Sequence, residues 1–327
     1  GGGRVLSFLD RLKNYRTLEA LYKESGWEKG EGWIRGNVND SHPAEHIIGK
    51  LMVESDSLTN SELALSSFDR VPNRPFQWPR CQEIYKPPLL LIHKHEDLNF
   101  GTWSGDYLTY PHTIVGFSAA TGDKKNLSLA ASWLKSHRRV LQAAIALSGT
   151  TAFASKATAV LSGDILQLPF PEDWDLDLSP HELILIDDIV DYYRQLIRHG
   201  QRSIAMKESG VPALPEFNDI FTSRINSIYW ENPLHALDKY IWPGVICQPY
   251  VFGSGEIDWT GASELKGKLD CLLREKRGSS LSVTRIARIY DGACIYLLKP
   301  DRLRYWLRSI ALRDADETLA DLAEQGF

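Results

Sequence analysis

Apolar residues return every three or four positions in several segments of the chain, a spacing that places them on one face of a helix. The clearest segments run from Leu127 to Leu147, followed by Gly149, and from Leu183 to Ile197, followed by Gly200. Glycine often ends a helix because it tolerates the left-handed backbone conformation. The chain also predicts helices over Val5 to Glu24, Pro215 to Tyr229 and Arg302 to Ala323.

Short runs of consecutive apolar and β-branched residues predict strands. Such runs cover Pro88 to His93 and Thr113 to Ala119. From Leu281 to Leu298, β-branched residues surround Asp291-Gly292, a dipeptide typical of a tight hairpin turn. Helices and strands together predict an α+β protein.

The proline-rich run from Leu168 to Pro180 marks a domain boundary, because proline continues neither a helix nor a central strand. A chain of 327 residues is long enough for two domains. We predict a first domain over residues 1–175, built of short strands and a long helix. The second domain, residues 176–327, is expected to be rich in helix and to contain the β-hairpin.

The composition is that of a globular protein, with 43% hydrophobic and 24% charged residues. No run approaches the roughly 18 consecutive apolar residues that span a membrane. We therefore expect a cytoplasmic protein with no membrane partner. The four cysteines lie far apart and form no C-x-x-C pair, which argues against a zinc ribbon.

Charge is distributed unevenly although the net charge is only −5. Eight acidic residues and no Lys or Arg lie between Glu172 and Asp191. Ten basic and three acidic residues lie between Arg274 and Arg313. Within this basic block, Arg304 and Arg308 are predicted to share one helix face, with Leu303 and Trp306 pointing inward. Guanidinium groups suit phosphates, so the block predicts either a nucleic-acid contact or, alternatively, pairing with the acids Asp314, Asp316, Glu317 and Asp321.

Other chemistry has weaker support in the sequence. The turn from Val251 to Glu256 is rich in glycine but lacks the Lys-Ser/Thr of a phosphate loop, which favours a turn that ends a strand. His93 and His95 offer two metal ligands without a third, so a strand end beside a turn is preferred. We assign no metal site. Neither a G-x-S-x-G nor an H-E-x-x-H motif occurs.

Four short segments follow one another along the chain: Trp27 to Ile34, Tyr85 to Lys94, Val115 to Ser118 and Gly163 to Pro171. In this order they resemble the C-terminal target-recognition portion of bacterial adenine-specific (N-6) DNA methyltransferases of restriction-modification and phage-defence systems. The likeness covers Tyr22 to Glu172 and implies that Gly163 to Pro171 is the strand and proline exit of a recognition domain. The region from Arg304 to Thr318 is similar to the C-terminal ends of such enzymes.

The sequence departs from that family in its catalytic motifs. Members carry an Asn-Pro-Pro-Tyr or Asn-Pro-Pro-Phe motif for the adenine amino group and a glycine-rich motif for S-adenosylmethionine, and this chain contains neither. The resemblance therefore implies a recognition part that is no enzyme by itself and has no catalytic residue or cofactor of its own. It would be a fragment of a longer methylase or a subunit, with double-stranded DNA and a separate methyltransferase catalytic domain or subunit as partners.

Recognition of DNA requires cations that hold phosphates and polar side chains that reach base edges. The candidate DNA-binding residues are Arg35, Arg74, Lys124, Lys125, Arg138, Arg139, Lys156, Arg304 and Arg308. Lys124 and Lys125 precede a predicted helix, so their backbone N–H groups are also expected to face a phosphate. Candidates for base contact are Asn37, Asn39, Asn73, Arg74 and Gln77.

Two other functions stay open. The first is a metal-dependent nuclease that uses Asp258, Glu264 and Lys266, which have the residue types of such a site. The second is a protein-binding assembly subunit, in which the C-terminal basic block and the acidic residues between Glu172 and Asp191 contact other chains.

Overall fold

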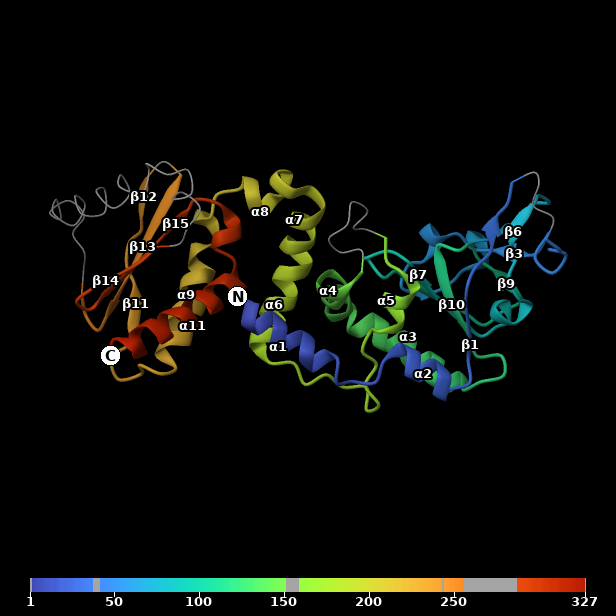
Figure 1. Ribbon diagram of the computed structural model, residues 1–327, viewed down its shortest axis with the longest axis horizontal. Coiled ribbons are helices and arrows are strands. Elements are labelled where there is room, and N and C mark those ends of the chain that lie inside the picture. Colours follow the sequence, from blue (N-terminus) through green and yellow to red (C-terminus); the bar gives the residue numbers. More distant parts are fainter. Residues whose placement is uncertain (1, 38–41, 151–158, 243, 256–286, 327) are drawn as a thin grey trace. The chain divides into compact units, whose positions relative to one another are not determined.

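The computed structural model describes residues 2–37, 42–150, 159–242, 244–255 and 287–326, which form both helices and sheets (Figure 1). The α+β prediction is confirmed. The chain separates into two compact units, Leu6–Leu178 and a C-terminal unit made of Gly1–Val5 with Ser179–Phe327. The division follows Leu178, whereas we predicted it after residue 175, and Gly1–Val5 lies with the second unit. Among the described residues, no helix has the length and apolar character needed to cross a bilayer.

The Leu6–Leu178 unit is built on a five-stranded sheet in the order β1-β10-β7-β8-β4. Neighbouring strands are antiparallel except β4, which is parallel to β8. The predicted strands near residues 88–93 and 113–119 are confirmed as β7 and β10. The five strands are β1 (Glu28–Glu31), β10 (Ile114–Ser118), β7 (Leu89–His93), β8 (Phe100–Trp103) and β4 (Ser61–Glu62).

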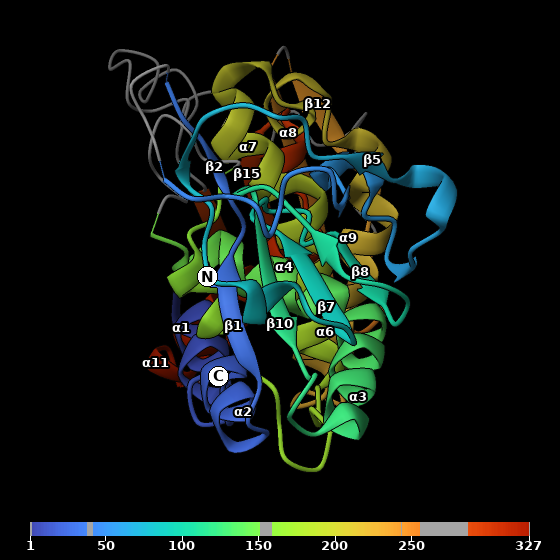
Figure 2. The ribbon, with the colours of Figure 1, turned by 90° about the vertical axis from the view of Figure 1, so that its right-hand side faces the viewer.

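Side chains of β7 alternate between two layers, as in any strand. Leu89 and Leu91 point into a core shared with the smaller sheets, and Leu90 pairs with Phe117 on the other face. Phe117 contacts the rings of Tyr22 and Trp27, and helix α3 lies against β7 and β8 (Figure 2). The helices of this unit are α1 (Gly2–Leu12, which begins in the C-terminal unit), α2 (Leu18–Glu24), α3 (Lys124–Ser136), α4 (Arg138–Ser148) and α5 (Ser162–Leu166).

Two predicted helices are each divided in two. The helix expected over Leu127 to Leu147 breaks at His137, whose ring stacks on Trp133 at 3.7 Å between centroids. The helix expected over Val5 to Glu24 breaks before Thr17, whose hydroxyl accepts a hydrogen bond from the Ala20 amide and so starts α2. At Thr17 the side chain caps the new helix, whereas at His137 it is the backbone that leaves helical geometry, with φ −109° and ψ 18°.

The strand that the family resemblance implied within Gly163 to Pro171 is wrong. Residues Ser162–Leu166 form the helix α5 instead. The Asp164 carboxylate accepts hydrogen bonds from the Leu161 amide and the Thr150 hydroxyl, which favours a helical start over an extended chain.

Two small sheets cover the other face of the main sheet. The first pairs β2 with β6, and the second has the order β5-β3-β9. Tyr110 packs so closely over the main sheet that a Cβ at Gly116 would lie 2.0 Å from its hydroxyl oxygen. Only glycine fits at this position. The elements are β2 (Ile34–Arg35), β6 (Phe76–Trp78), β3 (Leu51–Met52), β5 (Asp69–Arg70), β9 (Leu108–Thr109) and the 3₁₀ turns Ser55–Ser57, Leu65–Ser67 and Gln82–Tyr85.

The C-terminal unit contains a second five-stranded sheet, with the path β11-β13-β15-β14 and β12 paired to β13. The predicted hairpin is confirmed in β14 and β15, and Gly292 at φ +56° makes its turn. We predicted only this hairpin, so the sheet is larger than expected. Its strands are β11 (Leu234–Ala236), β12 (Tyr240–Trp242), β13 (Val245–Phe252), β14 (Ala287–Asp291) and β15 (Cys294–Pro300).

Helices pack against one face of this sheet around Phe217, Tyr250 and Trp306. The predicted helix over Leu183 to Ile197 is confirmed and ends where Gly200 adopts φ +50°. The helix predicted from Pro215 is also confirmed, as α9. The helical segments are α6 (Pro180–Asp188), a π-turn (Ile189–Tyr193), α7 (Arg194–His199), α8 (Ile204–Lys207), α9 (Leu214–Asn226), α11 (Arg308–Glu324) and the 3₁₀ turns Gly200–Arg202, Val211–Ala213 and Leu303–Tyr305.

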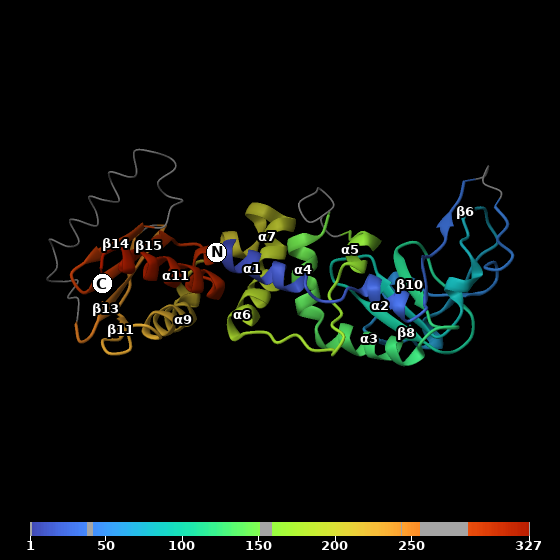
Figure 3. The ribbon, with the colours of Figure 1, turned by 60° about the horizontal axis from the view of Figure 1, so that its bottom comes forward.

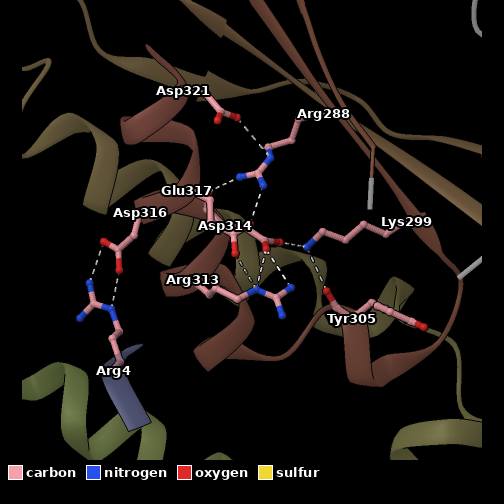
Figure 4. A network of polar contacts seen from close by, with 9 residues as sticks. All are labelled: Arg4, Arg288, Lys299, Tyr305, Arg313, Asp314, Asp316, Glu317 and Asp321. Atoms are coloured by element: carbon pink, nitrogen blue, oxygen red, sulfur yellow. Dashed lines mark hydrogen bonds and ion pairs between the residues drawn. The ribbon is translucent and has the colours of Figure 1, made fainter. Parts of the chain in front are cut away.

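A buried ion pair ties β15 to α11 (Figure 4). Lys299 forms an ion pair with Asp314, and both side chains are fully buried. The Lys299 ammonium also lies 4.0 Å from the ring centroid of Phe217 and 4.5 Å from that of Trp306. Burial lowers the pKa of Lys299 to about 8, although Asp314 acts in the opposite direction. Two residues that counted as surface charges in the sequence thus belong to the core.

Candidate nucleic-acid interface

Strands β2 and β6 form a short two-stranded antiparallel ribbon within the Leu6–Leu178 unit. Ile34 pairs with Trp78 and Arg35 with Phe76, with an irregularity between the two pairs. Phe76 is buried and its ring meets the buried Trp33 edge-on at 5.4 Å. Strand β6 of the ribbon therefore packs on the core through Phe76. It lies at the end of this unit that is farthest from α4 (Figure 3).

Several residues predicted to bind DNA gather on this ribbon although they are far apart in the sequence. Arg35 lies on β2 and Gln77 on β6. Asn37 follows β2 within two residues, and Asn73 and Arg74 precede β6. All of them except the half-buried Arg74 are exposed. Asn39, the remaining candidate for base contact, is outside the described residues.

The side chain of Arg74 contacts Trp33, the buried residue on which Phe76 of the ribbon packs. Its guanidinium carbon lies 5.9 Å from the ring centroid of Trp33, a cation–π geometry. Its Nε atom is buried, with no hydrogen-bond partner among the described residues. The contact with Trp33 restricts the rotamers of Arg74 and so keeps this cation at the ribbon.

Sequence reasoning missed two residues of the ribbon, Trp78 and Arg80. Trp78 is 51% exposed, which is unusual for so large an apolar side chain, and the Arg80 guanidinium carbon lies 5.6 Å from its ring centroid. The signal was present in the run from Arg74 to Arg80, which combines arginines with two aromatic residues. The run from Arg302 to Arg308 combines arginines with two aromatic residues in the same way.

The ribbon and its immediate flanks carry positive charge. Residues 32–37 and 73–80 contain three arginines, Arg35, Arg74 and Arg80, and no Asp or Glu. Within the part of the chain that the structure describes, none of these arginines has a carboxylate within ion-pair distance. Their positive charge is therefore not compensated by direct contacts.

The two lysines at the start of α3 are exposed, as expected of phosphate contacts. The Asp123 carboxylate, however, caps this helix and accepts hydrogen bonds from the amides of Lys125 and Asn126 at 2.8 and 3.1 Å. The expected phosphate site on these backbone N–H groups is therefore wrong. Lys124 instead lines a groove of about 650 Å³, beside Ser128 and other residues of α3 and β8.

Arg138 has a structural role in the described fold. Its guanidinium donates hydrogen bonds to the Asp97 carbonyl oxygen and to the Asn99 side chain, and so fixes the turn after β7. Arg139 is exposed on α4. Lys156 is outside the described residues.

Arg304 and Arg308 do not share a helix face, because the predicted helix from Arg302 is divided. Arg304 lies in a 3₁₀ turn, and Arg308 is the first residue of α11. Arg304 donates hydrogen bonds to Met206 Sδ and to the Tyr305 hydroxyl at 3.2 and 2.7 Å. The predicted inward positions of Leu303 and Trp306 are confirmed, since both are buried.

Carboxylates of the acidic segment neutralise Arg308. Its guanidinium nitrogens lie 3.4 Å from Asp187 Oδ2 and 3.8 Å from Asp188 Oδ1. Asp188 is fully buried, which raises its pKa, and it also accepts a hydrogen bond from the Ser309 amide at the start of α11.

Most of the described basic block between Arg274 and Arg313 is paired in the same way. Arg288 lies 2.5 Å from Glu317, and Arg313 lies 3.0 Å from Asp314 (Figure 4). With Lys299 and Arg308, four of the six described cations of the block form ion pairs. Arg274, Lys276, Arg277 and Arg285 are outside the described residues. In the described part of the block, most of the positive charge is therefore compensated by nearby carboxylates.

The other candidate chemistry finds little support in the described residues. The rings of His93 and His95 stack at 5.3 Å, and burial, followed by the charge of His95, lowers the pKa of His93. In the described ranges, no three His, Cys, Asp or Glu side chains gather in a way that would hold a metal ion. β13 ends at Phe252, and Gly253 at φ +73° makes the turn, as preferred. The nuclease candidates Asp258, Glu264 and Lys266 are outside the described residues.

Comparison with known proteins adds no family assignment: no protein-family model matches the chain, and no curated protein sequence matches it.

Proposed function

We propose that the chain is the DNA target-recognition module, or subunit, of a restriction-modification or phage-defence DNA methyltransferase. In this proposal the chain binds double-stranded DNA, and a separate catalytic domain or subunit supplies S-adenosylmethionine binding and methyl transfer. The observation that carries the proposal is the β2–β6 ribbon with its uncompensated arginines.

The shape of the ribbon suits a DNA groove. The major groove of B-form DNA is about 12 Å wide and admits a two-stranded β-ribbon. Arg35 and Gln77 project from the ribbon at exposed positions, and Arg74 and Arg80 flank β6. Arginine pairs with phosphate oxygens or with the guanine edge, and glutamine pairs with the adenine edge. The ribbon therefore combines the two kinds of contact that a sequence reader needs.

The rigidity of the ribbon also supports this function. A recognition surface loses affinity when its side chains must be ordered on binding. Here Trp33 and Phe76 fasten the ribbon to the core, and the Gly36 amide donates a hydrogen bond to the Pro75 carbonyl oxygen at 3.1 Å. The arginines project from a surface that is ordered before DNA arrives.

Within the described residues, the turn after β13 is the glycine-rich segment to test as a site for S-adenosylmethionine. The glycine-rich turn after β13 would have to leave space for a ligand beside its backbone. The Asn232 side-chain oxygen occupies one side of the turn, since a Cβ at Gly253 would lie 2.6 Å from it, and a cleft of about 740 Å³ lies beside Gly253, Ser254 and Gly255. The chain contains neither the catalytic motif nor the glycine-rich motif of the family, so we derive no catalytic step for it and assign methyl transfer to its partner.

Salt-dependent binding tests the proposal. Fluorescence anisotropy would measure the affinity for a labelled duplex between about 50 and 200 mM salt, with log K falling by roughly 0.9 per phosphate contact for each log unit of salt. Arg35→Ala should weaken binding and reduce this slope by about 0.9. Arg302→Ala is the matched control, because Arg302 is an exposed arginine of the C-terminal unit. Binding that ignores salt, or an equal loss in both variants, contradicts the proposal.

A further inference from the structure

Trp78 presents an aromatic face where a recognition ribbon would normally carry polar groups. Its side chain is 51% exposed, whereas Phe76, two residues earlier on the same strand, is fully buried. A single exposed tryptophan is common on protein surfaces, so its exposure alone indicates nothing, but Trp78 also lies beside the arginines of the ribbon. Trp78 therefore lies within the candidate nucleic-acid interface.

Two hydrogen bonds hold the backbone that follows Trp78, and a third holds the side chain of Arg80. The buried Tyr85 hydroxyl donates to the Pro79 carbonyl oxygen at 3.1 Å, and His46 Nε2 donates to the Arg80 carbonyl oxygen at 2.8 Å. Arg80 Nε donates to the Gly32 carbonyl oxygen at 3.4 Å. The tryptophan therefore extends from a rigid support and does not depend on a flexible loop.

Arg80 also has a strained backbone. Its φ is +68°, in the left-handed region that a residue with a Cβ avoids at a cost of about 1–2 kcal/mol. Such strain persists where surrounding contacts determine the conformation, and it concentrates at functional sites. Here it directs the guanidinium over the Trp78 ring, at 5.6 Å from the ring centroid. The ring of His42 lies nearly parallel to Trp78, at 6.2 Å and 17°.

An indole face flanked by a guanidinium binds the face of a nucleobase. Aromatic side chains stack on bases, and an adjacent arginine adds cation–π attraction and holds the phosphate. In an intact duplex the base faces are covered by their neighbours, and only base edges are open in the grooves. A base can therefore reach Trp78 only after it has left the stack.

We propose that Trp78, with Arg80 and His42, is a stacking platform for an unstacked base, so that the preferred ligand is duplex DNA with one base displaced from the helix. This inference rests on the proposed function, because it assumes that the ribbon faces DNA. It adds the form of DNA that the ribbon prefers.

Three labelled DNA probes of equal length test the platform: a fully paired duplex, the same duplex with a one-nucleotide bulge, and a single strand. Anisotropy should show tighter binding of the bulged duplex than of the paired one. Trp78→Ala should weaken binding of the bulged duplex by about tenfold to a hundredfold, and Trp78→Phe, which keeps a ring, should lose less. Trp230→Ala is the control, because Trp230 is 73% exposed in the C-terminal unit, and it should leave affinity unchanged.

The outcomes separate this inference from the proposed function. Salt-dependent binding of the paired duplex without preference for the bulge overturns the platform and leaves the proposed function standing. A strong preference for the single strand over both duplexes overturns both, and so does binding of no DNA. An equal loss for Trp78→Ala on the paired and bulged duplexes overturns the platform, because the indole then acts on an intact helix or another partner. Circular dichroism confirms that each variant is folded.

Discussion

Removal of the Asp314 carboxylate should strongly destabilise the C-terminal unit, because it leaves the buried ammonium of Lys299 without its counterion. Both side chains have no exposed surface. Breaking a buried ion pair by removing one partner costs about 3–5 kcal/mol. In a unit of this size, that loss corresponds to a fall in melting temperature of roughly 6–20 °C.

The remaining contacts do not replace the missing charge. Lys299 keeps a hydrogen bond to the Tyr305 carbonyl oxygen at 3.0 Å and its position beside the Phe217 ring, which are weaker than a direct counterion. Arg313, the other partner of Asp314, still has Glu317 at 3.6 Å and is partly exposed. Most of the cost should therefore come from Lys299.

Urea unfolding followed by circular dichroism measures this loss for Asp314→Asn. Glu317→Gln is the control, because this carboxylate is 44% exposed in its pairs with Arg288 and Arg313, and it should cost less than about 1 kcal/mol. The double variant Lys299→Met with Asp314→Leu removes both charges and should recover stability relative to Asp314→Asn. A cost below about 1 kcal/mol for Asp314→Asn, or no recovery in the double variant, refutes the reasoning.

Three further predictions concern stability. Gly116→Ala places a Cβ 2.0 Å from the Tyr110 hydroxyl oxygen and should cost about 1–3 kcal/mol in thermal unfolding, and an unchanged melting temperature would contradict this packing. Ser179→Ala removes the capping box with Glu182 at the start of α6 and should cost about 1 kcal/mol in urea unfolding, whereas no change would show that the box is dispensable. Burial lowers the pKa of Lys299 from 10.5 to about 8, so the unfolded chain binds more protons between these values. The unfolding free energy of the wild type relative to Lys299→Met should therefore rise with pH in this window by up to about 1.4 kcal/mol per unit, and a flat difference contradicts the shift.

Sequence patterns correctly predicted the elements whose signal comes from residues that are close together in the chain. β7 and β10 are buried on both faces, so they read as continuous apolar runs. The turn at Gly292 and the helix end at Gly200 need positive φ, which glycine provides. These signals depend on a few neighbouring residues, so no knowledge of the tertiary fold is needed to find them.

The ribbon and the helix breaks could not be predicted in the same way. β2 has two residues and β6 has three, too few for a period to appear. The break at His137 accompanies the stacking of its ring on Trp133, and the apolar spacing continues across it. At the candidate site, the polar residues of the ribbon were identified one by one, but only the pairing of Arg35 with Phe76 brings them together.

Charge counting along the sequence could not decide whether the C-terminal basic block faces solvent or pairs with carboxylates, and most of its described cations are paired. Arg308 is neutralised by Asp187, which precedes it by 121 residues, and a pair at 3.4 Å has almost no net field beyond the Debye length of about 8 Å in physiological salt. The ribbon and its flanks contain fewer arginines than the C-terminal basic block. Within the described residues, however, no carboxylate lies at ion-pair distance from Arg35, Arg74 or Arg80. Steering of a polyanion depends on charge that is not compensated locally. Arg35, Arg74 and Arg80 should therefore contribute more to the capture of DNA than the larger C-terminal block.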